Sequence, residues 1–222
     1  MLEQLYSLFE NHFSDTYKGW EHFIEFLAAD NSREHFLQLH SRLEWLFKDK
    51  NLCQRVLKVY DPRLLRSDYR DHLGEMYLEK IAGNNVATKR GQFLTPDTVS
   101  TLMGEMCIPP TEKNIYVLDP AVGSGRLLMA AHKRAPHAVL FGVDVDLSMY
   151  HIALANFAIH NIHGFLLHAD SLLHETDIAT TDGRANWAYA NRWDSCIEKL
   201  VSSSPKATIT GSDNGNNQTN LF

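Results

Sequence analysis

The feature that most constrains the fold is a glycine-containing loop between a short apolar segment and a helix. Residues 115–118 form an apolar, β-branched run that predicts a buried strand. Residues 119–125 follow and read Asp-Pro-Ala-Val-Gly-Ser-Gly, after which a helix is expected to about Arg134. Glycines at such a turn let a ligand approach the backbone, and the helix N-terminus presents free N–H groups to an anionic group. The segment therefore predicts a ligand-binding α/β unit.

Two further strands continue this pattern. Residues 138–143 are apolar and end at Asp144, and a long helix is expected over 147–161. Residues 165–167 form a shorter apolar run before Asp170. Strands that alternate with helices indicate a parallel sheet with right-handed crossovers. The fold class is therefore expected to be α/β, with a reduced, Rossmann-like parallel sheet.

The remainder of the chain predicts the domain organisation. Apolar residues repeat at helical spacing through residues 1–82, and a helical N-terminal subdomain is expected over 1–84. The α/β domain then covers 85–200. From Ser202 the chain is rich in Ser, Thr, Asn and Gly, so 201–222 is expected to be a flexible tail.

The α/β domain is expected to begin with a helix that starts at Thr95-Pro96. Threonine is a common cap, and proline is favoured in the first turn. The apolar side of this helix is expected to come from four residues: Val99, Leu102, Met103 and Met106.

Composition excludes several classes of protein. The 222 residues carry a net charge of −6, and no apolar run is long enough to span a bilayer. The three cysteines lie far apart and the twelve histidines are scattered, so we expect neither disulfides nor a metal site, and a cytoplasmic location. Residues 33–70 hold nine bases against five acids, which suits either phosphate contacts or a solvated helical surface.

The acids at the strand ends indicate the ligand. Asp119 precedes the loop and suits a cation or an amino group, whereas a pyrophosphate would not be placed beside a carboxylate. Asp144, rather than its neighbour Asp146, is placed to accept hydrogen bonds from ribose hydroxyls. Asp170 is placed to accept from an exocyclic amine. Leu128 replaces the third glycine of the dinucleotide fingerprint, so a nicotinamide enzyme is the weakest alternative.

These segments also resemble a known family. Residues 91–96 (Gly-Gln-Phe-Leu-Thr-Pro), followed by 117–125, resemble the methylation subunits of type I restriction–modification systems and related adenine-N6 DNA methyltransferases. The resemblance covers residues 85–175 and implies S-adenosylmethionine as cofactor. It places the following residues in the cofactor site: Phe93, Thr95, Asp119, Ala121, Gly123, Gly125, Asp144 and Asp170. The alternative interpretation is that these residues bind no ligand: Thr95 caps a helix, the glycines form a tight turn, and the acids are surface residues at strand ends.

The sequence departs from the family at the catalytic segment. The family carries an Asn/Asp-Pro-Pro-aromatic tetrapeptide after a fourth strand, and no such segment follows Asp170. The nearest match is 186–189 (Asn-Trp-Ala-Tyr), in which Asn186 and Tyr189 keep the spacing but both prolines are missing. Simple packing of these aromatics onto the domain is the other interpretation. The chain is therefore either a methyltransferase of adenine in DNA or a cofactor-binding module without activity.

Partners are expected for either function. DNA is the expected substrate or ligand, and a partner subunit could supply the missing elements. Residues 218–222 (Gln-Thr-Asn-Leu-Phe) resemble the peptide with which bacterial proteins bind the replication sliding clamp. In this hypothesis Gln218, Leu221 and Phe222 contact the clamp.

Overall fold

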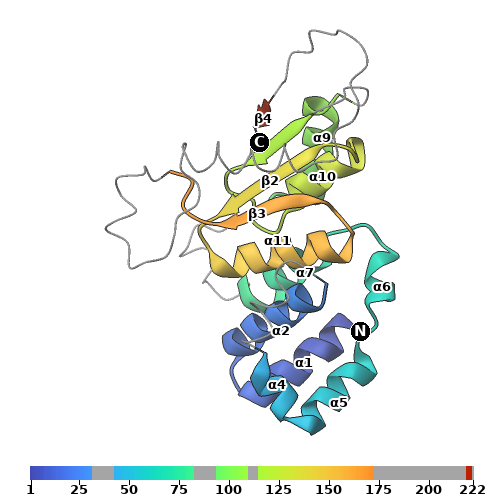
Figure 1. Ribbon diagram of the computed structural model, residues 1–222, viewed down its shortest axis with the longest axis vertical. Coiled ribbons are helices and arrows are strands. Elements are labelled where there is room, and N and C mark those ends of the chain that lie inside the picture. The colour runs from blue at the N-terminus through green and yellow to red at the C-terminus, as the bar shows by residue number, and fades with distance from the viewer. Residues whose placement is uncertain (32–42, 83–93, 110–114, 173–218, 222) are drawn as a thin grey trace.

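The computed structural model describes residues 1–31, 43–82, 94–109, 115–172 and 219–221. These residues form a helical half at the N-terminus and an α/β half (Figure 1). The helical half consists of α1 (Leu2–Phe13), α2 (Thr16–Asn31), α4 (Glu44–Lys48), α5 (Lys50–Val59), α6 (Pro62–Arg66), α7 (His72–Tyr77) and a short π-helix, η1 (Leu78–Ala82). The α/β half consists of α9 (Asp97–Cys107), β1 (Tyr116–Asp119), α10 (Arg126–Arg134), β2 (Val139–Asp144), α11 (Leu147–Ile159), β3 (Gly164–His168) and β4 (Thr219–Leu221).

Aspartates begin three of the N-terminal helices. Asp49, Asp61 and Asp71 cap α5, α6 and α7, and each side chain accepts a backbone N–H from the first turn of its helix. Such caps satisfy donors that have no partner within the helix. The described parts of residues 1–82 are mainly helical, and residues 32–42 of the expected helical region lie outside them. The expected boundary between residues 84 and 85 lies outside the described residues.

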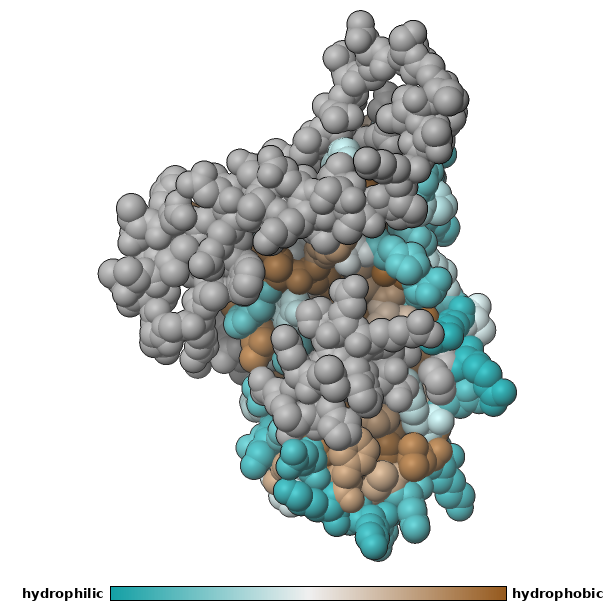
Figure 2. Space-filling view, in the orientation of Figure 1, coloured by the Kyte–Doolittle hydropathy of each residue, from teal (hydrophilic) through white to brown (hydrophobic). Residues whose placement is uncertain are grey.

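The described bases of the basic stretch, from Lys48 to Arg70, are exposed to solvent. In the space-filling view, hydrophilic residues lie along the outer rim of the helical half, around a smaller hydrophobic area (Figure 2). Some of these bases pair with acids of their own helix or its cap: Lys48 Nζ lies 3.3 Å from Glu44 and Arg63 Nη2 lies 2.9 Å from Asp61. Exposed pairs of this kind contribute little to stability. No helix in the described parts of the chain is long and apolar enough to cross a membrane.

The sheet confirms the expected α/β fold class. The strand order is β3-β2-β1-β4, and all three strand pairs are parallel. Asp119 lies opposite Gly142, and Asp144 lies opposite His168. Because the strands are parallel, their carboxyl ends meet at one edge of the sheet, where parallel α/β proteins bind ligands. The acids at the ends of β1 and β2 are thus brought together.

Strand β4 differs from the sequence-based expectation. Thr219–Leu221 was expected in a flexible tail, yet it pairs in parallel with β1, and Leu221 lies opposite Leu118. A strand of only three residues has no recognisable pattern in the local sequence. Its pairing with β1 depends on contacts between residues that are far apart in the chain. The segment expected to bind a sliding clamp is therefore partly used in the sheet, and the clamp hypothesis gains no support from the fold. Gln218 and Phe222 lie outside the described residues.

Helix α9 also corrects an expectation. Ser100 and Gly104 are buried, whereas Val99, Leu102 and Met106 are exposed and Met103 is half-buried. A Cβ atom on Gly104 would lie 3.1 Å from the carbonyl oxygen of Ala130 in α10. The two helices approach so closely that only the small residues of α9 fit between them, and its larger apolar residues point outward.

Helix α11 joins the two halves. It is apolar on all sides, which is typical of a buried helix. It packs on β2 and β3 and also contacts α2, α6 and α7, as its position between the sheet and the helical half shows (Figure 1). One hydrophobic core therefore runs through the molecule, from Leu5 and Phe9 to Leu140 and Leu166.

A matched pair of leucine substitutions tests this packing. Leu128 is fully buried, so Leu128→Ala is expected to lower the free energy of unfolding by about 2–5 kcal/mol through lost burial and the resulting cavity. Leu102 is exposed on α9, and Leu102→Ala is expected to change the same quantity by less than about 0.5 kcal/mol. Urea unfolding followed by circular dichroism measures both. A large loss in Leu102→Ala would show that α9 instead buries its apolar side.

Candidate functional site

The loop between β1 and α10 is held in a conformation that favours glycine. Gly123 and Gly125 have φ angles of +55° and +87°. Added Cβ atoms would also lie 3.2 Å from Leu94 Cδ2 and 3.2 Å from Phe157 Cε1, respectively. The N–H of Val122 donates to the carbonyl of Val143 at 2.8 Å, which fixes the loop to β2. Glycine is therefore required here for backbone conformation and for space.

Asp119 is a buried carboxylate beside this loop. It is only 3% exposed, and its Oδ1 accepts the N–H of Ala121 at 3.1 Å. Its Oδ2 is buried and has no hydrogen-bond partner among the described residues. Burial raises the pKa of Asp119 to about 6, and the nearby Asp144 adds to this rise. A buried acceptor without a donor is costly, so this oxygen fits a ligand that brings an N–H group or a positive charge.

Asp144 supports the loop from the end of β2. Its Oδ2 accepts the N–H of Gly123 at 2.8 Å, and its Oδ1 accepts the N–H of Asp146 at 2.8 Å. Burial raises its pKa above the ordinary range. Each carboxylate oxygen has a second lone pair, so Asp144 can still accept from a ligand hydroxyl. Asp146 has a separate task, because its side chain caps α11 through Ser148 and Met149.

The remaining predicted residues divide into two groups. Asp170 follows β3, is half-buried, and accepts the N–H of Leu172 at 2.9 Å. Ala121 is exposed in the loop. Thr95 does not cap α9 as expected, since Pro96 holds that position, but its carbonyl accepts a hydrogen bond from Arg126 at 2.7 Å. The other group lies outside the described residues and comprises Phe93, Asn186 and Tyr189.

A buried aspartate of the helical half reaches the loop, and the sequence did not reveal it. Asp71 is 2% exposed. Its Oδ1 accepts from Gly74 N at 2.6 Å and from Asn156 Nδ2 at 2.7 Å. Its Oδ2 accepts from Ser124 Oγ at 2.6 Å and from Arg126 Nε at 3.0 Å. One carboxylate thus joins α7, the glycine loop, α10 and α11.

Arg126 is the only part of this network that the sequence could have flagged. It is a charged residue at the start of a helix whose next three residues are apolar, Leu127, Leu128 and Met129. In the structure it is 7% exposed, and its Nη2 lies 2.9 Å from Asp71 Oδ2. A buried arginine requires a nearby anion, but its partner lies 55 positions away in sequence.

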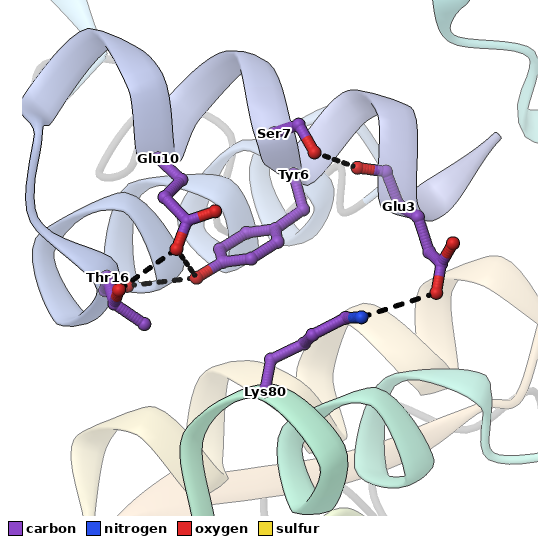
Figure 3. Close-up of a pocket in the computed structure, with 6 residues that line it drawn as sticks. All are labelled: Glu3, Tyr6, Ser7, Glu10, Thr16 and Lys80. Carbon is purple, nitrogen blue, oxygen red and sulfur yellow. Dashed lines mark hydrogen bonds and ion pairs between the residues drawn. The ribbon is translucent and has the colours of Figure 1, made fainter.

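A pocket lies elsewhere, between α1, α2 and η1 (Figure 3). It has a volume of about 270 Å³ and is lined by polar side chains: Glu3, Tyr6, Ser7, Glu10, Thr16 and Lys80. These groups bind one another; Glu10 accepts from Tyr6 at 3.2 Å and from Thr16 at 2.9 Å. It contains none of the predicted site residues. Across the described ranges, no cluster of His, Cys, Asp and Glu could hold a metal ion.

Solved structures with related folds show only distant similarity. A protein from Listeria monocytogenes described as a class I S-adenosylmethionine-dependent methyltransferase is 17% identical, with a TM-score of 0.44 over 76% of this chain and 53% of its own. The methyltransferase subunit of a type I restriction-modification system from Streptococcus thermophilus is 26% identical, with a TM-score of 0.39 over 55% of this chain and 26% of its own.

Sequence comparisons identify the family. The methylase subunit of the type I restriction enzyme MjaVIII from Methanocaldococcus jannaschii is 29% identical over an alignment of 129 residues, and the match covers 54% of this chain. The chain spans 22% of the length of that subunit. A family model described as N-6 DNA Methylase matches residues 68–215, about two thirds of the chain. The match includes the glycine loop and the acids after β1, β2 and β3, and S-adenosylmethionine is the cofactor that this family implies. The chain therefore belongs to the N-6 DNA methylase family.

Proposed function

We propose that this chain binds S-adenosylmethionine at the carboxyl edge of its sheet and takes part in methylation of adenine N6 in DNA. The observation that carries the proposal is the buried Oδ2 of Asp119, which has no hydrogen-bond partner in the described part of the chain and lies beside two glycines with positive φ. A methyl donor with an amino-acid end brings the cationic ammonium group that this oxygen lacks. A pyrophosphate would instead meet a negative charge at this position.

Five of the predicted residues have a defined role in this proposal. Asp119 accepts from the ammonium group, and the loop at Gly123 and Gly125 gives the carboxylate of the amino-acid end access to the N-terminus of α10. Asp144 accepts from the ribose hydroxyls with its second lone pairs. Asp170, after the next strand, accepts from the exocyclic amine of the adenine. The cofactor supplies an activated methyl group, and these residues bind and orient it.

Methyl transfer itself is assigned to residues outside the described ranges. In this proposal Asn186 accepts from the target amine, and Tyr189 stacks on an adenine flipped out of the duplex. The family match supports the assignment because it continues past both residues, to 215. Transfer would depend mainly on positioning of the methyl group against the amine.

The second candidate is a module that binds the cofactor without methylating alone. Residues 186–189 lack both prolines of the family's catalytic segment, so in this candidate the missing elements are supplied by a partner. A partner subunit is part of this proposal. Transfer of a labelled methyl group to DNA is measured for the wild type and for Asn186→Ala, which distinguishes the two candidates. Activity that is lost in the variant supports an enzyme. A wild-type protein that is inactive without a partner supports a module.

Two neighbouring aspartates provide a matched test of cofactor binding. Asp144→Ala removes the proposed ribose acceptor and the partner of Gly123 N–H, so the Kd for S-adenosylmethionine is expected to rise about 10- to 100-fold, the effect of losing one or two hydrogen bonds to a charged group. Asp146→Ala removes the cap of α11 and is expected to leave the Kd within about twofold. Isothermal titration calorimetry measures both. No binding by the wild type would refute the proposal.

The pKa of Asp119 predicts a pH dependence of binding. Its carboxyl titrates near pH 6 in the free protein and must be charged to hold an ammonium group. Affinity is therefore expected to be constant above about pH 7 and to fall below pH 6, approaching tenfold per pH unit. Asp119→Asn should bind weakly with little pH dependence. A wild-type Kd that stays the same from pH 8 to pH 5 would contradict the role of Asp119.

A further inference from the structure

We propose that Asp71 is a positioning residue for the cofactor pocket, through which the N-terminal helix α7 holds the glycine loop in its left-handed conformation. The proposal rests on the proposed function, since it concerns the same pocket. It assigns a role in cofactor binding to a residue that is not at the carboxyl edge of the sheet.

The contacts of Asp71 use its full capacity as an acceptor. A carboxylate offers about four lone-pair positions. Gly74 N and Asn156 Nδ2 donate to Oδ1, and Ser124 Oγ and the Arg126 guanidinium donate to Oδ2. Of these four donors, only Gly74 lies in α7, the helix that Asp71 caps. The other three donors come from the α/β half, so the carboxylate is oriented mainly by the pocket side of the molecule.

Ser124 is held at both its side chain and its backbone. It lies between the two positive-φ glycines and is almost fully buried. Its hydroxyl donates to Asp71 Oδ2 at 2.6 Å, and its carbonyl accepts from Asn156 Nδ2 at 2.9 Å. Asn156 in turn donates to Asp71 Oδ1. These bonds form a closed ring, which fixes the peptide groups on either side of Ser124 and hence the direction of the loop N–H groups.

Arg126 extends the control to the segment before α9. While its Nε and Nη2 contact Asp71, its Nη1 donates to the carbonyl of Thr95 at 2.7 Å. The neighbouring Leu94 lies against Gly123, where an added Cβ would be 3.2 Å from Leu94 Cδ2. A guanidinium has a planar, rigid set of donors, so fixing one side fixes the other. Asp71 therefore positions the glycine loop and the Leu94–Thr95 segment together.

Capping alone does not explain the burial of Asp71. Asp49 and Asp61 cap α5 and α6 by the same kind of hydrogen bond, and their side chains are 40% and 31% exposed. The side chain of Asp71 is 1% exposed. Removing a carboxylate from water is costly unless charged and polar donors replace the water. In this chain those donors belong to the loop and to the helices beside it.

The test compares Asp71→Asn with Asp49→Asn, which alters a cap of the same kind in α5. Calorimetry is done at a temperature at which both variants are fully folded. The Kd for S-adenosylmethionine is expected to rise about 10- to 100-fold in Asp71→Asn, as for groups that orient the ligands of a metal site. It should change by less than about twofold in Asp49→Asn. An unchanged Kd in Asp71→Asn would overturn the proposal.

A second readout uses the free protein and does not depend on the cofactor. The NMR order parameters of the Gly123 and Gly125 amides are expected to be about 0.85 in the wild type and in Asp49→Asn, and below about 0.6 in Asp71→Asn. Unchanged order parameters in Asp71→Asn overturn the proposal, whether or not the wild type binds cofactor. Failure of the wild type to bind cofactor would by itself refute only the proposed function.

Gly74→Ala replaces Asp71→Asn if that variant does not fold. A Cβ at this position would lie 2.7 Å from Asp71 Cγ and 2.8 Å from Oδ1, so the carboxylate must move. Alanine is a better helix former than glycine, and α7 itself should not be weakened. In Gly74→Ala, the order parameters of the Gly123 and Gly125 amides should fall and the Kd for S-adenosylmethionine should rise, as expected for Asp71→Asn. Wild-type values for both quantities would contradict the proposal.

Discussion

The ion pair between Asp71 and Arg126 is the contact on which the arrangement of the two halves depends. Both side chains are almost completely buried, and their charged atoms lie 2.9 Å apart. Burial of either charge alone would be strongly unfavourable, and loss of one partner of a buried pair typically costs about 3–5 kcal/mol. Gly74, Ser124 and Asn156 satisfy the remaining lone pairs of Asp71. This ion pair thus links the helical half to the start of α10, directly after the glycine loop.

The apolar contacts act in the same direction. Helix α11 is buried between the sheet and α2, and a single core includes side chains from both halves. The helical half is therefore part of the folded unit that forms the pocket. In this arrangement a change in the N-terminal helices is transmitted to the glycine loop by direct contact.

The carboxyl edge of the sheet, by contrast, contains charge that is not fully compensated. Asp119 and Asp144 are close enough to raise the pKa of Asp119, and one oxygen of Asp119 has no donor among the described residues. Perturbed carboxylates of this kind are typical of binding sites, where stability is given up for the ligand. The contrast between the satisfied Asp71 and the unsatisfied Asp119 separates a positioning role from a binding role.

Local patterns explain what the sequence could predict. The strands β1, β2 and β3 are apolar runs, so the fold class was predictable. Asp119, Asp144 and the glycines directly follow β1 and β2, so their position together at one edge of the sheet was predictable too. Features made by distant contacts were not. Asp71 meets Ser124 and Asn156, which lie 53 and 85 positions away, and the pairing of β4 with β1 also has no local signal.

The prediction of the buried side of helix α9 was wrong for a different reason. Its apolar spacing predicts that Val99, Leu102 and Met106 are buried, but close approach of two backbones selects Ser100 and Gly104 for the interface. A hydropathy pattern indicates which residues are apolar, but it does not indicate where close helix packing requires small side chains. The same limit hid Gly74, which leaves room for the carboxylate of Asp71.

Native-state hydrogen exchange, with and without S-adenosylmethionine, tests most directly whether the cofactor pocket and the N-terminal helices form one unit. At a cofactor concentration of 100 times the Kd, amides that exchange through global unfolding should gain about 2.7 kcal/mol of protection. The account predicts this gain for the slowest amides of α1 and α2 as well as for those of β1 and β2. A gain confined to the α/β half, with unchanged exchange in α1 and α2, would contradict it.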